Sequence, residues 1–197
     1  MSSYMVLAAV TDTLRSILWQ AFSADPVLQP VVGSESAIVF SNPTETARDS
    51  ANRLSLWLYQ VTENEFLKNQ APSRGNGGNS SQMPPLALNL YYLITPFATS
   101  GNADLLLLGS TMQVLYDSAV ILLHDPVDDV FEELRVVLCR LSLEELTLVW
   151  QALREPYRLS VCYQVRVTRI DSRRVVEGAR VVEYDRGYGA IPAHVPE

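Results

Sequence analysis

The stretch that decides the fold runs from Leu54 to Phe97. It reads LSLWLYQVTENEFLKN, then a gap rich in Gly, Asn and Ser, then PPLALNLYYLITPF. The period of two predicts a β-strand at each end. Large side chains stand on both faces of both strands: Leu54, Leu56 and Leu58 alternate with Ser55, Trp57 and Tyr59, and Leu86, Leu88, Leu90 and Tyr92 alternate with Ala87, Asn89, Tyr91 and Leu93. Each sheet face therefore needs a cover. The chain's own helices can supply one and a partner the other, which favours a subunit of an assembly over a free enzyme.

Three segments have helical periodicity. The first, from about Tyr4 to Phe22, places apolar residues at steps of three and four: Leu7, Val10, Leu14, Ile17, Leu18 and Ala21. The second runs from Asp104 to Leu123 and has one apolar face: Leu105, Leu108, Met112, Leu115, Ala119 and Leu122. A shorter helix is predicted to begin at Ser142, because Glu145 three residues later completes a capping-box pattern.

Further strands are predicted at 37–40, 134–141, 157–170 and 173–184. The order of helices and strands predicts an α+β fold: a single domain with a mainly antiparallel mixed sheet, on which two long helices and one short helix pack. We expect residues 1–172 to form this domain, with a flexible loop at about 70–84. Residues 173–197 are expected to form a C-terminal strand or arm and a flexible tail.

Size and charge narrow the possible functions. A chain of 197 residues is long enough for one domain with its own core, and its 48% apolar content fits either an assembly subunit or a large core. Residues 1–152 carry seven basic and sixteen acidic side chains, whereas residues 153–197 carry eight and six. The basic end can steer docking onto an acidic neighbour. A sequence pI near 4.9 argues against nucleic acid as a partner.

The two cysteines belong to no CxxC motif. Cys139 and Cys162 stand in apolar, strand-like segments, so we expect buried free thiols in a reducing cytoplasm, with a disulfide left open. No secretion signal is expected, because Asp12 and Arg15 interrupt the N-terminal apolar run. No membrane span is expected either, since glycines, asparagines and prolines break the uncharged segment 75–103.

Catalytic motifs are sparse. One dense titratable cluster suits a hard cation or acid–base chemistry in principle: His124, Asp125, Asp128, Asp129, Glu132 and Glu133. Its spacing matches no calcium loop, and it brackets a predicted helix end and strand start, where solvated acids are common. The glycines at 75–78 lack phosphate-loop spacing, and no GxSxG motif is present.

Aromatic residues offer a second candidate site. Trp57, Tyr59, Tyr91 and Tyr92 could form a stacking platform for sugars or bases, although most such aromatic residues serve core or cross-strand packing. We therefore predict no catalytic residue, no metal site and no cofactor, and a protein that acts by binding rather than as an enzyme.

Four blocks resemble, in this order, the tail-cap proteins of extracellular contractile injection systems of the antifeeding-prophage type. They are LSLWLYQVTENEFLKN, PPLALNLYYLITPFA, LLLLGSTMQVLYDSAVILLHDP and SLEELTLVWQALREPYRLSVCYQVRVTRIDS. The resemblance extends from the first helix to Ile170 and fades in the loop and the tail. The order of the blocks carries it, since no single motif is diagnostic.

The resemblance implies a structural tail terminator of a phage-tail-like particle. Six copies would form a ring at the baseplate-distal end, stop polymerisation of the inner tube and tie the last sheath layer to it. The implied partners are other copies of the chain, the inner tube protein and the sheath protein, with no nucleic acid and no membrane insertion. The implied location is the bacterial cytoplasm, in a particle that is released or anchored by other components.

Two segments are candidate contacts. We hypothesise that 173–184 is an extended arm that pairs with a neighbour, its side chains meeting an acidic or aromatic groove: Arg173, Arg174, Arg180, Tyr184 and Tyr188. A last strand of the chain's own sheet is the other explanation. The loop around Gly75, with Asn76 and Gly77, is the second candidate contact. A baseplate-side or neck adaptor, a small ligand-binding domain, and an enzyme using the acidic cluster remain as alternatives.

Overall fold

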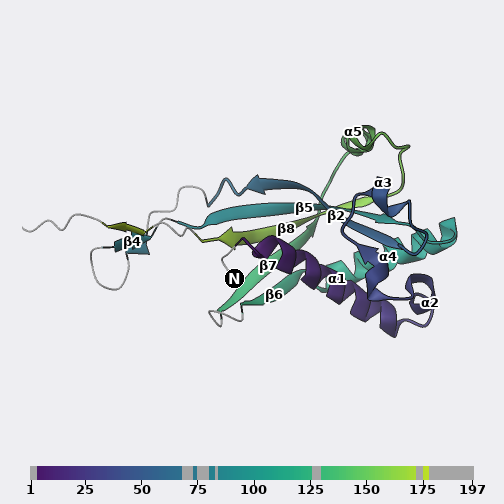
Figure 1. Ribbon diagram of the computed structural model, residues 1–197, viewed down its shortest axis with the longest axis horizontal. Helices are drawn as coiled ribbons and strands as arrows, with labels where there is room; N and C mark the ends of the chain where they lie inside the picture. Colours follow the sequence, from purple (N-terminus) through teal and green to yellow (C-terminus); the bar gives the residue numbers. More distant parts are fainter. Residues whose placement is uncertain are drawn as a thin grey trace, which may run out of the picture. The chain divides into compact units, whose positions relative to one another are not determined.

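The computed structural model describes residues 4–67, 73–74, 80–82, 84–125, 130–171 and 175–177. The chain divides into two compact units (Figure 1). Unit 1 comprises Met1–Gln70 and Pro85–Asp171, and unit 2 comprises Ala71–Pro84 and Ser172–Glu197.

Unit 1 is built on a six-stranded sheet with the order β1-β2-β5-β8-β7-β6. Its strands are β1 (Ile38–Val39), β2 (Leu54–Glu63), β5 (Leu86–Pro96), β6 (Val120–Asp125), β7 (Val130–Leu138) and β8 (Val161–Ile170). β1 runs parallel to β2, and all the other neighbours pair antiparallel. The predicted α+β fold with a mixed, mainly antiparallel sheet is confirmed.

Five α-helices and one short 3₁₀ turn accompany the sheet in the described part of the chain. They are α1 (Val6–Ala24), α2 (Gln29–Val32), the turn Glu35–Ala37, α3 (Pro43–Thr46), α4 (Gly101–Asp117) and α5 (Leu143–Leu153). α2 ends at Gly33, whose φ of 78° is one that glycine adopts without strain. The predicted capping box of α5 is present, with Ser142 and Glu145 bonding each other's backbone N–H groups.

The core lies between one face of the sheet and the helices α1 and α4. α1 buries the stripe predicted from its periodicity, with Val10, Leu14 and Leu18 almost fully inaccessible. The facing strands bury Leu54, Leu56, Leu90, Tyr92 and Ile94. Thr11 Oγ1 donates to the Leu7 carbonyl at 2.8 Å and lies 2.8 Å from the Tyr92 hydroxyl, which joins α1 to β5.

The helix predicted from Asp104 to Leu123 is wrong at its C-terminal end. α4 stops at Asp117, and the residues from Val120 onward form β6. The helix contains four consecutive leucines, and the residues that follow them before Asp117 are uncharged. Hydrophobic periodicity therefore does not reveal which side of the helix faces the core. The structure buries Leu107, Leu108, Thr111 and Leu115, whereas Leu105 and Leu122 are 59% and 63% exposed.

Two strand boundaries also differ from the prediction. β7 begins at Val130, not Leu134, because its first residues pair with β6 in a hairpin. β8 begins at Val161, not Tyr157, and residues 157–160 form an irregular link from α5 to the strand.

Unit 2 contains a small antiparallel sheet with the order β3-β4-β9. β3 (Ser73–Arg74) and β4 (Ser80–Gln82) come from the glycine-rich segment, and β9 (Val175–Glu177) comes from the C-terminal segment. Two segments far apart in the sequence, both predicted as partner contacts, are thus paired with each other.

Candidate interaction surfaces

The predicted contact residues lie outside the described part of the chain. These are Arg173, Arg174, Arg180, Tyr184, Tyr188, Asn76 and Gly77. The same two segments contain the described strands β4 and β9, which pair from Ser80 opposite Glu177 to Gln82 opposite Val175.

The acidic cluster is arranged differently from the prediction. Its described members lie on the paired strands β6 and β7 rather than between a helix end and a strand start. Glu133 pairs with Arg135 at 3.0 Å, and burial raises the pKa of Glu132. Asp128 and Asp129, and the side chains of His124 and Asp125, fall outside the description. Among the described residues, no group of three or more His, Cys, Asp or Glu side chains is placed to hold a metal ion.

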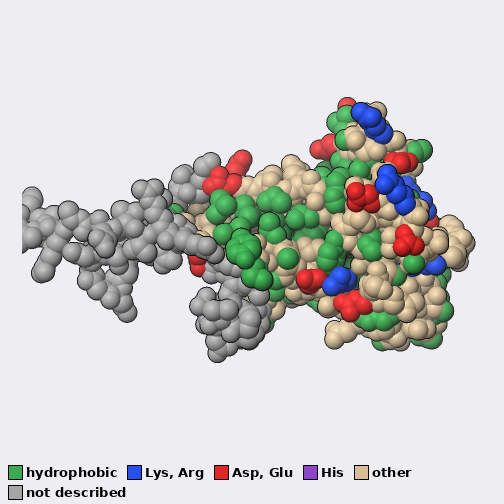
Figure 2. All heavy atoms as spheres, in the orientation of Figure 1, with side chains coloured by type: hydrophobic (Ala, Val, Ile, Leu, Met, Phe, Trp, Pro, Cys, Tyr) green, Lys and Arg blue, Asp and Glu red, His purple; other side chains and the backbone are tan. Residues whose placement is uncertain are grey.

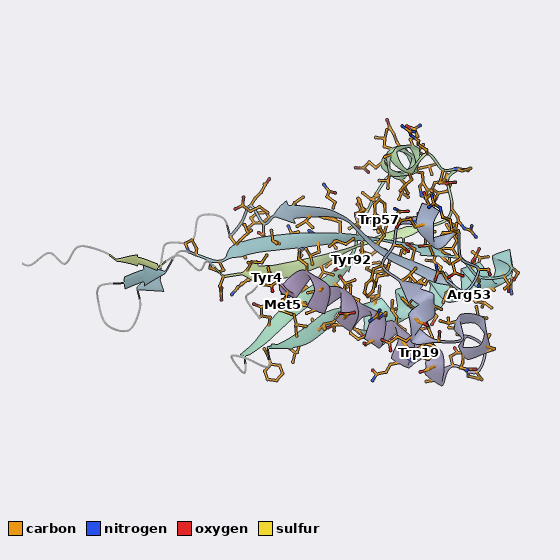
Figure 3. All side chains as sticks on the ribbon, in the orientation of Figure 1. Tyr4, Met5, Trp19, Arg53, Trp57 and Tyr92 are labelled. Carbon is orange, nitrogen blue, oxygen red and sulfur yellow. The ribbon has the colours of Figure 1, made fainter. Side chains whose placement is uncertain are left out.

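Three of the four candidate aromatic residues lie together on the outer face, the sheet face opposite α1 and α4. The ring centroids of Trp57 and Tyr59 are 6.0 Å apart, and those of Tyr59 and Tyr91 are 6.4 Å apart. Tyr92 is excluded from this group because it faces the core and is 0% exposed. Figure 3 labels Trp57 on β2 and Tyr92 on β5. The outer face therefore carries a group of three partly buried aromatic side chains on the side away from α1 and α4.

Polar side chains continue this surface into a cleft of about 410 Å³. Gln164 Nε2 donates to the Tyr91 hydroxyl at 3.0 Å, and Arg166 Nε donates to Gln164 Oε1 at 2.9 Å. Phe66, which is 96% exposed, stands at the same cleft. Figure 2 shows hydrophobic side chains gathered over β2, β5 and β8, with charged side chains clustered around α3 and α5.

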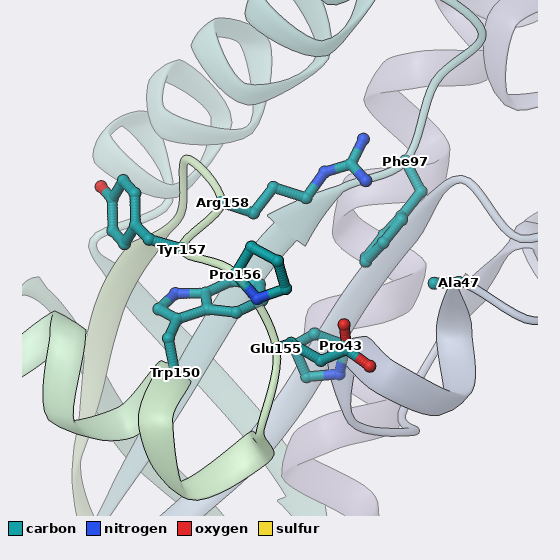
Figure 4. Close-up of a pocket in the computed structure, with 8 residues that line it drawn as sticks. All are labelled: Pro43, Ala47, Phe97, Trp150, Glu155, Pro156, Tyr157 and Arg158. Carbon is teal, nitrogen blue, oxygen red and sulfur yellow. The ribbon is translucent and has the colours of Figure 1, made fainter.

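A second cleft, of about 330 Å³, lies beside α5 (Figure 4). Its lining is mostly aromatic and prolyl: Pro43, Ala47, Phe97, Trp150, Glu155, Pro156, Tyr157 and Arg158. The Arg158 guanidinium lies 4.5 Å from the Phe97 ring centre and 3.2 Å from Asp104. Trp150 is 3% exposed, and its Nε1 donates to Ser160 at 3.3 Å. The cleft is thus lined mainly by apolar and aromatic side chains, together with the charged Glu155 and Arg158.

The outward side of α4 is a third surface, which we name the α4 face: Leu105, Leu106, Gly109, Gln113 and Tyr116. All five residues are exposed, Tyr116 by 81%, and no charged residue occurs between Leu105 and Tyr116. A Cβ added at Gly109 would meet nothing within 4 Å. The sequence pattern misassigned this side because Leu105 was expected to be buried.

Comparison with known proteins shows the family of the chain. The family model described as the Pvc16 N-terminal domain matches residues 9–184. The chain belongs to this family. The expected resemblance to the tail-cap proteins of contractile injection systems is thereby confirmed. No match was found among the curated proteins.

One solved structure shares the fold of this Pvc16 N-terminal domain. The chain is similar to the PVC sheath/tube terminator of an extracellular contractile injection system in its extended state, with 17% identity and a TM-score of 0.64. That match covers 96% of this chain but 65% of the terminator, so the chain spans less than two thirds of its length. It is also similar to the tube-terminating cap of the anti-feeding prophage, with 19% identity, a TM-score of 0.46, and coverage of 68% and 48%.

The described helices of this family domain include none that is both long and apolar enough to cross a membrane.

Proposed function

We propose that the chain is a structural cap subunit of a phage-tail-like contractile injection particle. In this proposal six copies form a ring at the baseplate-distal end, where the ring terminates the inner tube and holds the last layer of sheath. The observation that carries the proposal is the family match over residues 9–184. The cap acts by binding the tube protein, the sheath protein and its own copies, and it is assembled in the bacterial cytoplasm.

A cap has to stop a repeating assembly. Each tube or sheath ring presents a surface that accepts the next ring, so a terminator has to match that surface on one side and offer no match on the other. Several separate apolar surfaces on one domain suit this task, because neighbouring copies, the tube and the sheath each need their own contact. The α4 face, the α5 cleft and the outer face are three such surfaces.

Unit 2 is the proposed contact with the particle. The pairing of β4 with β9 supports this, since the glycine-rich loop and the C-terminal segment act together when they share one sheet. Arg173, Arg174 and Arg180 would bring positive charge to a chain whose first 152 residues are strongly acidic. Tyr184, Tyr188, Asn76 and Gly77 complete the proposed contact.

Truncation after Ser172 tests this contact. The protein should stay folded but bind purified tube or sheath more weakly, because β9 and the arginines are removed. Shortening residues 70–84 to a few residues should have the same effect. A truncated protein that still caps particles of normal length contradicts the proposed contact.

The cap proposal itself is tested by the mass and shape of the purified chain. Light scattering coupled to size exclusion should give about six subunits, and negative-stain images should show closed rings, alone or after addition of purified tube. Electron microscopy of particles with a labelled chain should place the label at the end distal to the baseplate. A label at the baseplate or neck would identify an adaptor instead. A monomer that binds neither tube nor sheath would indicate a small ligand-binding domain.

A further inference from the structure

Cys139 and Cys162, which are far apart in the sequence, face each other across two neighbouring strands. β7 and β8 pair with Leu138 opposite Tyr163, so the next pair in this antiparallel register is Cys139 opposite Cys162. The Cys139 N–H donates to the Cys162 carbonyl at 2.8 Å. Directly opposed residues point to the same face, with Cα atoms about 4.5–5.5 Å apart. This separation lies within the range of about 4.4–6.8 Å that a disulfide requires.

The two thiols also contact each other and Tyr59. Their side chains hydrogen-bond, and the Tyr59 hydroxyl lies 3.3 Å from Cys162 Sγ. Cys162 is 3% exposed, whereas Cys139 is half-buried. Both are free thiols in this structure. The reduced pair is therefore held close together at the margin of the outer face.

We propose that Cys139 and Cys162 form a redox modification site, in which a hydroperoxide converts the two thiols into a disulfide between β7 and β8. The inference is independent of the cap proposal, because it rests on strand register and side-chain contact alone.

The electrostatics favour Cys162 as the sulfur that is oxidised first. The hydrogen bond from Cys139 lowers the pKa of Cys162, and the Tyr59 hydroxyl lowers it further, although burial opposes both. The same hydrogen bond raises the pKa of Cys139. Of the two thiols, Cys162 is therefore the one that forms a thiolate more readily, and this thiolate is the nucleophile.

The reaction balances with hydrogen peroxide as the oxidant. The Cys162 thiolate attacks one peroxide oxygen, the O–O bond breaks, and hydroxide leaves to give a sulfenic acid. Cys139 then attacks the Cys162 sulfur, its proton is lost, and the S–O bond breaks to release a second hydroxide. The proton from Cys139 and the proton released when the Cys162 thiolate formed convert the two hydroxides into water. Two thiols are oxidised and one peroxide is reduced to two waters. The small exposed fraction of Cys162 favours a small oxidant over a bulky disulfide.

The disulfide would close a covalent loop around α5. Residues 140–161 contain α5 and most of the cleft beside it, including Trp150, Pro156 and Arg158. α5 exposes Leu143 by 67% and Leu148 by 60%. A bond at the base of this segment restricts the unfolded chain and so raises the thermal midpoint, on the order of 5 °C. Oxidation would therefore fix the α5 cleft without changing its lining.

The test uses the full chain, reduced and then treated with stoichiometric hydrogen peroxide. After alkylation with N-ethylmaleimide, intact mass should show the loss of two hydrogens and no adduct. Peptide mapping should find Cys139 joined to Cys162, and the thermal midpoint should rise and return on reduction. A protein that keeps both adducts after treatment, or that forms only covalent dimers, would overturn the proposal.

Two variants separate the roles of the residues. Cys139→Ser keeps the size of a half-buried side chain and should accumulate a sulfenic acid at Cys162 that dimedone traps. Tyr59→Phe keeps the ring but removes the hydroxyl, and should slow the reaction several-fold while leaving the final disulfide unchanged. A Cys139→Ser protein with native circular dichroism and no sulfenic acid at Cys162 would contradict the assigned order. Equal rates for Tyr59→Phe and the natural protein would remove Tyr59 from the site.

Discussion

Tyr92 carries a hydroxyl group into the middle of the core. Thr11 donates its only hydroxyl hydrogen to the Leu7 carbonyl, so Tyr92 has to be the donor in its 2.8 Å hydrogen bond with Thr11. Burial raises the pKa of Tyr92 to about 12, from an ordinary value of 10.0. Because the folded-state pKa is the higher one, this contribution to stability is complete below pH 10 and is lost as the pH rises to 12.

The free energy of unfolding should therefore fall by about 2–3 kcal/mol between pH 10 and 12 on account of Tyr92. Denaturant titrations across this range measure the slope, and Tyr92→Phe should reduce it. Burial also raises the pKa values of Tyr59 and Tyr163, so part of the slope should remain. At neutral pH, Thr11→Val should cost about 1–3 kcal/mol because it leaves the buried Tyr92 hydroxyl without an acceptor. An unchanged slope in Tyr92→Phe would contradict the prediction.

Arg154 ends α5 in a left-handed conformation, with a φ of 57°. Its N–H donates to the carbonyls of Trp150 and Gln151, so the cap geometry is complete, but a side chain with a Cβ is disfavoured there. Arg154→Gly should therefore stabilise α5 by about 0.5–1 kcal/mol. Hydrogen exchange of the α5 amides measures this directly. Arg154→Ala is the matched control, since it removes the same charge but keeps the strain. Equal protection in the two variants would show that the left-handed conformation carries no cost.

At the scale of elements, the α4 face is proposed as the contact with a second copy of this chain. A chain with a net charge of −7 repels its own copies, so copies approach best through a surface without charge. Gly109 stands in the middle of this face with open space around it. Gly109→Arg should keep or raise the stability of the monomer, by about 1 kcal/mol from helix propensity. The same substitution should block ring formation, because the new side chain occupies the docking surface.

Light scattering and thermal unfolding of Gly109→Arg together decide this prediction. Ala8→Arg is the matched control, since Ala8 is exposed on α1 and receives the same side chain. The control should form the same oligomer as the natural chain. Rings of unchanged size in Gly109→Arg would exclude the α4 face as a contact between copies.

Helices whose outer side or first turn carries charged or capping residues were predictable from the sequence. The long segment without charged residues was not. Asp12 and Arg15 mark the outer side of α1, and Ser142 with Glu145 marks the start of α5, so both helices were found. The segment from Leu105 to Leu123 contains no charged residue before Asp117. Its change from helix to strand depends on pairing with β7. Strand register is also invisible in one sequence. The contact between Cys139 and Cys162, and the pairing of β4 with β9, therefore emerge only in three dimensions.

At the scale of the whole molecule, stability and attachment are proposed to reside in different units. The buried hydrophobic cluster described in the structure lies entirely in unit 1, and it includes the inward residues of α1, α4 and the six-stranded sheet. The described strands of unit 2 are only two or three residues long, so they cannot bury a comparable core. Unit 1 should thus fold without unit 2.

A variant that ends at Asp171 and replaces residues 71–84 with a short glycine–serine linker tests this division. Its thermal midpoint should stay within a few degrees of the full chain, because the hydrophobic cluster is intact. Leu90→Ala in the full chain is the contrasting variant. Leu90 is 0% exposed in that cluster, so its truncation should cost about 2–5 kcal/mol. If the unit 1 variant instead unfolds as readily as Leu90→Ala, unit 2 contributes to the fold, and loss of particle binding on its removal no longer indicates a direct contact.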